Sequence, residues 1–272
     1  MKRILLFAAA MLMVLSCGQN SKKKEQTKET KMLVLYYSQT GNTKAVAEAI
    51  QAKTGADIEA VVSMNPYDGD YNSTIQRCLN EMQAGTYPEI QPLNSNLAEY
   101  DVVFIGYPVW FGTYAPPIET LLNTADLKGK KVVPFCTFGS GGLDSSSKAM
   151  AAKLTESELL PGYGVRAARI DAIDAELDQF LKEGGFIEGE PVAVEAYPEA
   201  VPVTEEQAAI FDAAVANYPM IQAKAETVAA RQHFQGGQEY LFSARDARSN
   251  AIMKVNVLVE EGKAPVFTQV YR

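Results

Sequence analysis

The stretch that decides the fold is Leu33-Val-Leu-Tyr-Tyr-Ser-Gln-Thr-Gly-Asn-Thr43. Its apolar first half has the length and composition of a buried β-strand, and it ends abruptly in small hydroxyl residues and one glycine. Residues 44–50 continue with apolar side chains at helical spacing, which predicts the start of a helix. We therefore interpret the stretch as a strand, a tight loop and a helix N-terminus, where unpaired N–H groups and the helix dipole favour a phosphate.

The loop in this stretch predicts a phosphate site made of neutral donors. Ser38, Thr40 and Thr43 contribute hydroxyl groups, and Gly41 lets the backbone approach a ligand closely. The Gly-Lys-Ser/Thr ending of a nucleotide triphosphate loop and the Gly-x-Gly-x-x-Gly spacing of a dinucleotide fold are both absent. The alternative interpretation is a helix N-cap that is merely rich in Ser and Thr.

The chain after residue 31 alternates between strand and helix patterns. Strands are expected at residues 32–37, 56–62, 101–106, 131–136 and 165–170. Helices are expected at residues 43–53, 71–84, 117–123, 143–155 and 173–183. Continuous apolar strands that alternate with helices predict an α/β domain with a doubly wound, five-stranded parallel sheet covered on both faces. A ligand of such a sheet binds at the carboxyl ends of the strands.

The loops after the third and fourth strands have the composition of binding loops. Residues 106–117 contain Trp110, the only tryptophan of the chain, followed by Phe111. Aromatic side chains at this place are suited to stack on a flat ring, or alternatively to form a hydrophobic lid on the core. Residues 137–142 contain three glycines, so backbone groups there can approach a ring edge. Three such loops at strand ends predict one shared ligand site.

These loops carry a resemblance to the flavodoxin family, which extends over residues 31–185. The Ser/Thr-x-Thr-Gly-x-Thr form of residues 38–43 resembles the family's phosphate loop for FMN. The resemblance implies a flavodoxin-like fold with FMN as cofactor. It places the FMN phosphate on Ser38, Gln39, Thr40, Gly41, Asn42 and Thr43, one side of the ring on Pro108, Val109, Trp110, Phe111, Gly112 and Thr113, and the other side on Thr137, Phe138, Gly139, Ser140, Gly141 and Gly142.

Two features depart from classical members of this family, which are small, soluble and cytoplasmic electron carriers. This chain is expected to have an export signal and a further domain, and the acidic residues expected around the ring are scarce, with Asp144 the nearest candidate. Residues 66–71, together with Glu81, Pro88 and Glu89, instead resemble a flavodoxin-like subgroup found in bacteria.

The N-terminus has the features of a secretory signal peptide over residues 1–16, with a basic start and an apolar run at residues 4–15 that is too short to span a membrane. Residues 14–17 resemble the bacterial lipobox, which implies lipidation of Cys17 and a membrane-anchored lipoprotein of the cell envelope. The alternative is an ordinary cleaved signal followed by a chance cysteine. The polar, Lys-rich residues 17–31 are expected to be a tether.

The remaining chain is expected to form two domains, a flavodoxin-like FMN-binding domain over residues 32–187 and a smaller α+β domain over residues 204–272. Residues 188–203, with three prolines, are expected to be a linker. Thr204 and Gln207 have capping-box spacing for a helix, and a second helical stretch is expected to about Arg231. An antiparallel meander at residues 239–245, 252–259 and 265–271 follows, and the layout faintly resembles the cystatin fold.

The composition excludes several other functions. A net charge of −8 argues against nucleic acid as a partner. His233 is the only histidine and stands alone, which argues against its acting as a metal ligand or a catalytic base. Ser140 lacks the Gly-x-Ser-x-Gly elbow, which argues against a hydrolase. Neither Cys78 nor Cys136 has the spacing of a metal site or redox pair.

Two functions from different classes remain. The first is an FMN protein that transfers electrons to a redox partner protein, or reduces a small acceptor, in the cell envelope. The second is an envelope binding module on a flavodoxin scaffold that does not use FMN and whose C-terminal sheet holds a protein or glycan partner.

Overall fold

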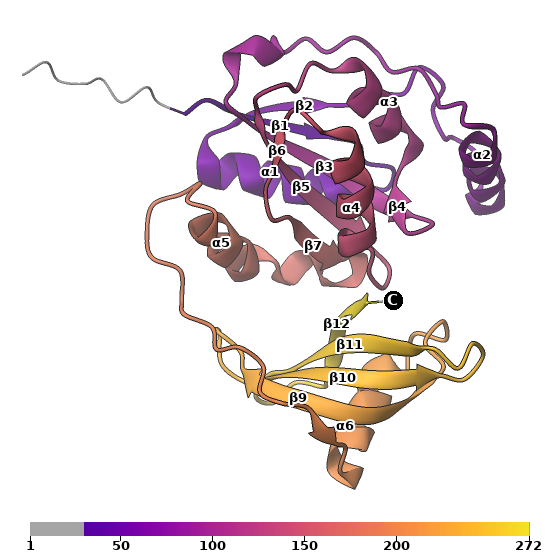
Figure 1. The fold of residues 1–272 in the computed structure, drawn as a ribbon, viewed down its shortest axis with the longest axis vertical. Coiled ribbons are helices and arrows are strands. Elements are labelled where there is room, and N and C mark those ends of the chain that lie inside the picture. The colour runs from indigo at the N-terminus through magenta and orange to yellow at the C-terminus, as the bar shows by residue number, and fades with distance from the viewer. Residues whose placement is uncertain (1–29, 272) are drawn as a thin grey trace, which may run out of the picture.

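The structure, a computed structural model, describes residues 30–271. In this part the chain forms a parallel sheet with helices on both faces, followed by a separate antiparallel sheet with one helix (Figure 1). The predicted signal peptide, Cys17 and most of the predicted tether lie outside the described residues. Within residues 30–271, no helix combines the length and the apolar character needed to cross a membrane.

The first sheet has the strand order of a doubly wound fold, β2-β1-β3-β5, with two short strands beside β5. Its parallel strands are β1 (Met32–Tyr36), β2 (Asp57–Ala60), β3 (Val102–Trp110), β5 (Lys131–Phe138), β6 (Glu158–Leu159) and β7 (Tyr163–Arg166). The fifth predicted strand is therefore misplaced: residues 163–166 form β7, and the 3₁₀ helix η2 (Ala167–Ala172) occupies most of the predicted range. Pro161 separates β6 from β7, because proline cannot donate to a ladder.

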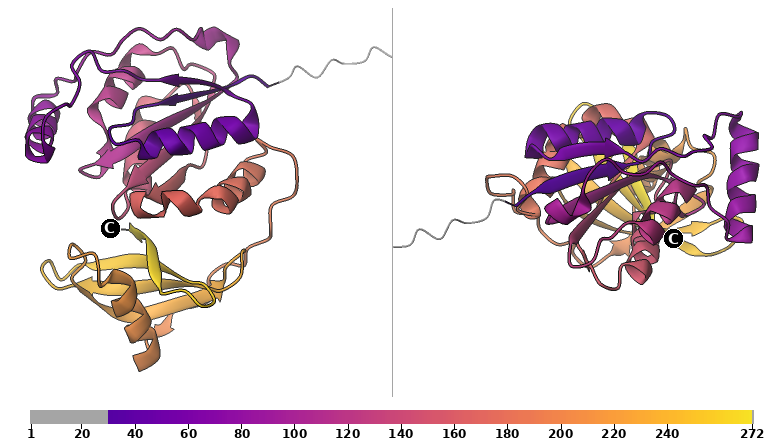
Figure 2. Two further views of the ribbon diagram at one scale, coloured as in Figure 1. Left: turned by 180° about the vertical axis from the view of Figure 1, so that it is seen from behind. Right: turned by 90° about the horizontal axis from the view of Figure 1, so that it is seen from above.

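Helices cover both faces of this sheet because alternate strand residues point to opposite sides. Leu33 and Leu35 of β1 pack into one core, with α3 (Pro116–Thr124) and α4 (Leu143–Lys153). Val34 packs into the other core, with α1 (Asn42–Thr54) and α5 (Asp174–Glu183). By contrast, α2 (Tyr71–Ala84) stands at the side of the sheet, and of its residues only Cys78 is buried (Figure 2).

The second domain is a five-stranded antiparallel sheet with one packed helix, α6 (Glu205–Val215). Its strands are β8 (Val201–Pro202), β9 (Ala223–Gln232), β10 (Gln238–Asp246), β11 (Ile252–Val259) and β12 (Val266–Tyr271). The Thr204–Gln207 capping box is confirmed. Residues 188–200 contain neither helix nor strand.

The second helix expected up to Arg231 is wrong, because this segment is strand β9. The apolar spacing of Ile221, Ala225 and Val228 suits a helix, but β9 pairs along its length with β10 and, near its middle, with β8. These pairings satisfy the backbone of β9 and bury Ala225 and Val228 in the second domain's own core. Tertiary pairing has here overridden a local pattern.

Candidate functional site

The structure brings together all three loops that the sequence singled out, at the carboxyl ends of β1, β3 and β5. The hydroxyl oxygens of Thr43 and Thr137 are 2.8 Å apart, which joins the first loop to the third. A Cβ on Gly142 would lie 2.5 Å from the side chain of Val109, so the second and third loops touch. The Ser145 hydroxyl, in the first turn of α4, donates to the carbonyl of Gly112.

The first loop is open toward its predicted ligand. Gly41 has a φ of 91°, and a Cβ on it would meet nothing within 4 Å. In the described structure no side chain caps α1, so the amides of Asn42 and Thr43 at its first turn have no helical partner. Thr43 is only 1% exposed, and its hydroxyl contacts that of Thr137, so this hydroxyl joins the two loops.

The strand end expected at residue 106 is wrong, because β3 continues to Trp110. The turn of the second loop is therefore a two-residue hairpin between β3 and β4 (Thr113–Tyr114), in which Trp110 pairs with Thr113. Its two central residues, Phe111 and Gly112, have φ values of 50° and 80°, which is the pattern of a type I′ turn. A positive φ costs a phenylalanine about 1–2 kcal/mol of backbone strain. Phe111 is 51% exposed, so burial of its ring does not offset this cost. Backbone strain of this kind tends to persist at ligand sites.

Trp110 is fixed by an aromatic cluster that the sequence analysis missed. Its ring meets Tyr67 edge to face at 5.1 Å between centroids, and Tyr37 at 6.1 Å. Burial raises the pKa of Tyr37 to about 12 and also raises the pKa of Tyr67. Both phenols therefore remain neutral. The contacts with these two rings hold the Trp110 side chain in place at the site.

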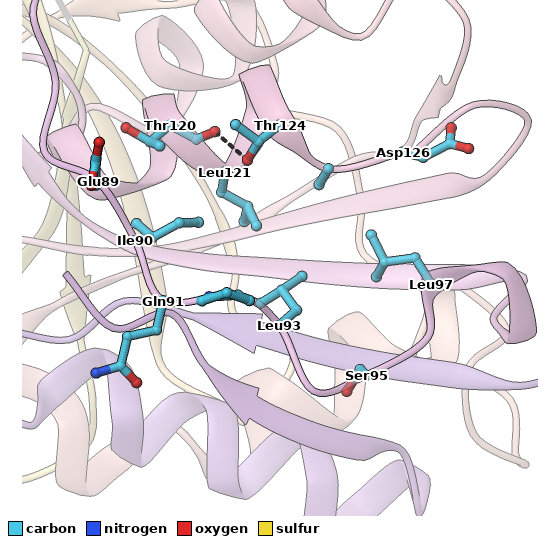
Figure 3. Close-up of a pocket in the computed structure, with 12 residues that line it drawn as sticks. Glu89, Ile90, Gln91, Leu93, Ser95, Leu97, Thr120, Leu121, Thr124 and Asp126 are labelled. Atoms are coloured by element: carbon cyan, nitrogen blue, oxygen red, sulfur yellow. Dashed lines mark hydrogen bonds between the residues drawn. The ribbon is translucent and has the colours of Figure 1, made fainter. Parts of the chain in front are cut away.

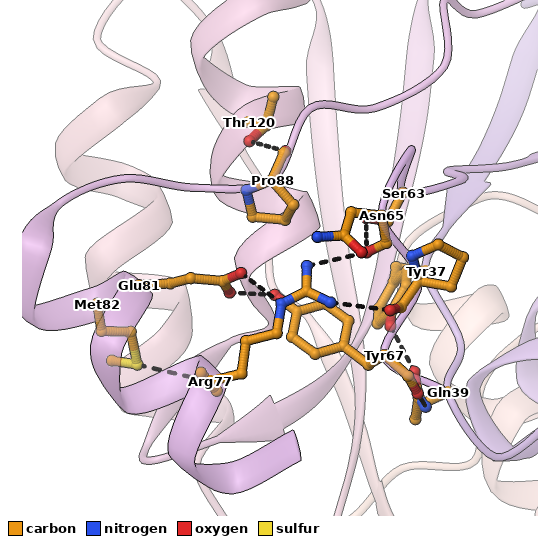
Figure 4. Close-up of polar contacts among 12 residues, drawn as sticks. Tyr37, Gln39, Ser63, Asn65, Tyr67, Arg77, Glu81, Met82, Pro88 and Thr120 are labelled. Carbon is orange, nitrogen blue, oxygen red and sulfur yellow. Dashed lines mark hydrogen bonds and ion pairs between the residues drawn. The ribbon is translucent and has the colours of Figure 1, made fainter. Parts of the chain in front are cut away.

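A polar network ties α2 and its preceding loop to the first binding loop (Figure 4). Arg77 donates to Glu81 at 2.8 Å, lies 3.9 Å over the Tyr67 ring and also donates to the carbonyls of Pro66 and Asn65. The Tyr67 hydroxyl donates to Glu81, and the Gln39 amide donates to the Tyr67 carbonyl. The sequence signals for this network were the i,i+4 spacing of Arg77 and Glu81 and the resemblance of residues 66–71 and Glu81 to a bacterial flavodoxin-like subgroup.

Two hollows border the hairpin of the second loop. One, of about 480 Å³, lies between the first two loops and α2, and its lining includes Gln39, Thr40, Trp110 and Cys78. The other, of about 320 Å³, lies between the second and third loops and is called here the ring-edge hollow. A third hollow of about 430 Å³ is formed by the segment 89–97 and by α3 and the residues after it, and none of its lining residues belongs to the three loops (Figure 3).

Comparison with known proteins shows the family of this chain. A family model described as Flavodoxin matches residues 31–176, more than half of the 272 residues. The chain belongs to the flavodoxin family. The matched region ends before the second domain begins.

Individual proteins are also similar to this chain. The NAD(P)H dehydrogenase (quinone) 3 of Rhizobium meliloti is 32% identical over 131 residues, a match that covers 43% of this chain and 58% of that enzyme. A protein of Bacteroides uniformis assigned to the flavoproteins is 25% identical with a TM-score of 0.50, covering 55% of this chain and 98% of that one. A flavoprotein of Lactobacillus acidophilus in complex with FMN is 30% identical with a TM-score of 0.46, covering 52% of this chain and 97% of that one.

The surroundings of the two cysteines and of the one histidine considered in the sequence suit a structural role. Cys78 and Cys136 are free and buried, and burial raises the pKa of both thiols, which keeps them protonated. His233 lies just after β9, where burial lowers its pKa and its ring accepts the amide of Gln235. Over residues 30–271, no cluster of His, Cys, Asp and Glu side chains is suited to a metal ion.

Proposed function

We propose that this flavodoxin-family chain binds FMN at the three loops and acts in electron transfer or in the flavin-dependent reduction of a small acceptor. The observation that carries the proposal is the convergence of the three loops at the strand ends, joined by the Thr43–Thr137 hydrogen bond. The bound flavin would supply the one- or two-electron chemistry, while the protein binds it and tunes its environment.

The residues of the site fit FMN in their chemistry. The free amides at the first turn of α1 and the nearby hydroxyl of Thr40 are neutral donors for a phosphate, in line with the open space over Gly41. The exposed Phe111 and the supported Trp110 offer aromatic surface for the ring. Among the described residues that line the ring-edge hollow, Asp144 is the one carboxylate, and it would disfavour extra negative charge on a bound ring.

One relative supports the reductase form of this proposal. The Rhizobium meliloti relative is named as an NAD(P)H dehydrogenase (quinone), so a small quinone is a reasonable class of acceptor to test first. The match spans only part of that enzyme, and activity toward a quinone is therefore proposed for this chain and not carried over.

Addition of FMN to the purified protein should produce a bound flavin spectrum and raise thermal stability. At a hundredfold excess over Kd, linkage stabilises the folded state by about 3 kcal/mol. Emission from Trp110, the only tryptophan, should be quenched as the site fills. A protein that shows neither a visible flavin band nor any rise in melting temperature with FMN would contradict the proposal and favour the binding-module hypothesis.

We also propose that the protein is attached to a membrane of the cell envelope through a lipid on Cys17. The support is the sequence of residues 1–17 and the polar residues 17–31 that follow. Cys17→Ser should move the protein from the membrane to the soluble fraction or block processing. The intact mass of the mature wild type checks this directly, since a different first residue without lipid would rule the anchor out.

A further inference from the structure

The second domain touches the first domain at the glycine-rich third loop. The amide of Val270, near the end of β12, donates to the carbonyl of Ser140 at 2.6 Å. The Arg166 guanidinium donates to the carbonyls of both Gly139 and Phe267 at 2.9 Å, and it lies 3.5 Å from the centre of the Phe267 ring. In Figure 1 the end of β12 accordingly rises from the second sheet toward the first domain.

Two glycines of the third loop make this contact possible, because any side chain there would clash with the second domain. A Cβ on Gly141 would lie 2.1 Å from the carbonyl oxygen of Val270, a distance that no real side chain allows. A Cβ on Gly139 would lie 2.9 Å from the hydroxyl of Tyr218. The sequence associates these glycines with a ring edge, and the structure adds a second reason for them, namely the close approach of the other domain.

The same contact gives the ring-edge hollow a third side. The second loop and the third loop form two of its sides, together with Asp144 and Ser145 of α4. Tyr218, Gln269, Val270 and Tyr271 of the second domain form the remaining side. Burial raises the pKa of the Tyr271 phenol, so this side chain of the wall is neutral at pH 7.

We propose that the second domain is part of the flavin site, with Tyr218 and the end of β12 as its outer wall. The inference rests on the proposed FMN binding, because a ring held between the second and third loops has this wall opposite it. The wall has two consequences: its aromatic side chains add to FMN affinity, and its position keeps protein-sized acceptors away from the ring while small acceptors still enter.

The test compares full-length wild type with Tyr218→Ala/Tyr271→Ala. FMN titration followed by Trp110 emission should give a Kd about tenfold higher for the double variant, the loss expected for two aromatic contacts. With apoprotein in excess, so that all flavin is bound, the chemically reduced double variant should also reduce ferric cytochrome c about tenfold faster than wild type, because the wall has lost its two aromatic side chains. The rate with ferricyanide, a small acceptor, should stay within about twofold of wild type.

The matched control is Tyr240→Ala. Tyr240 stacks on Phe242 at 5.7 Å in the second domain and is not among the residues that line the ring-edge hollow. It tests whether mere loosening of the second domain weakens FMN binding, and its Kd should equal that of wild type. If the double variant fails to fold by circular dichroism, Gln269→Arg, which adds bulk from β12 to the hollow, should raise the Kd instead.

The outcomes separate the two proposals. Failure of the wild type to bind FMN would overturn both the proposed function and this inference. Tight FMN binding by the wild type and by every wall variant alike would overturn this inference alone. An equal loss of affinity in Tyr240→Ala and in the double variant would likewise overturn it, because the effect would then reflect the stability of the second domain.

Discussion

Gly41→Val should weaken FMN binding by at least about a hundredfold. Gly41 stands at the start of α1 with a φ of 91° and open space around it, where the phosphate is proposed to bind. A branched side chain there projects into that space and blocks the free amides of the first turn. The loss of two hydrogen bonds to a charged phosphate, each worth about 1.5–3 kcal/mol, accounts for the size of the effect. Titration with FMN, followed by Trp110 emission, measures it.

The control for this prediction is Gly55→Val, at the other end of the same helix. Gly55 also has a positive φ, 70°, and a Cβ on it also meets nothing within 4 Å. Both variants should therefore lose about 1–2 kcal/mol of stability from backbone strain. Only Gly41→Val should lose FMN affinity, and equal affinities for the two variants would show that the phosphate does not bind at this loop.

Phe211→Ala should unfold the second domain before the first. Phe211 of α6 is fully buried, and its ring packs edge to face on Phe242 with centroids 5.3 Å apart. Removal of a buried phenylalanine side chain costs about 3–5 kcal/mol. The core around Phe211 is separate from the two cores of the parallel sheet, so the first domain should keep its own transition.

Calorimetry of the full-length chain should show this as two resolved transitions, with that of the second domain lowered by more than about 10 °C. Ile252→Ala is the matched control in the same domain, because its side chain is exposed and its loss should shift the melting temperature little. A single transition that moves as a whole in Phe211→Ala would mean that the two domains unfold as one unit.

Much of the first domain could be predicted because its signals are local. Residues 33–43 combine an apolar strand, a glycine and a helix start, and each of these is decided by neighbouring residues along the chain. The alternation of strands and helices then places three loops at one edge of a sheet, since the carboxyl ends of parallel strands meet there. The structure confirms the sheet and the meeting of the loops.

Contacts between segments that are distant in the sequence could not be predicted. The support of Trp110 by Tyr37 and Tyr67, and the link from Arg77 and Glu81 to Gln39, join side chains from different elements. The spacing of residues along one helix or strand does not indicate which side chains of other elements they will contact. The edge strand β7 was likewise misplaced, because its bounds depend on where it pairs with β5.

The sequence by itself determined the flavodoxin-like sheet, the open loop at α1 and the capping box of α6, because periodicity, glycine and capping chemistry act over a few residues. Only the tertiary structure decided that residues 223–232 form strand β9 and that β12 lies against the third loop. Strand pairing and domain docking depend on partners far away in the chain, and a glycine such as Gly141 cannot indicate which atom will approach it.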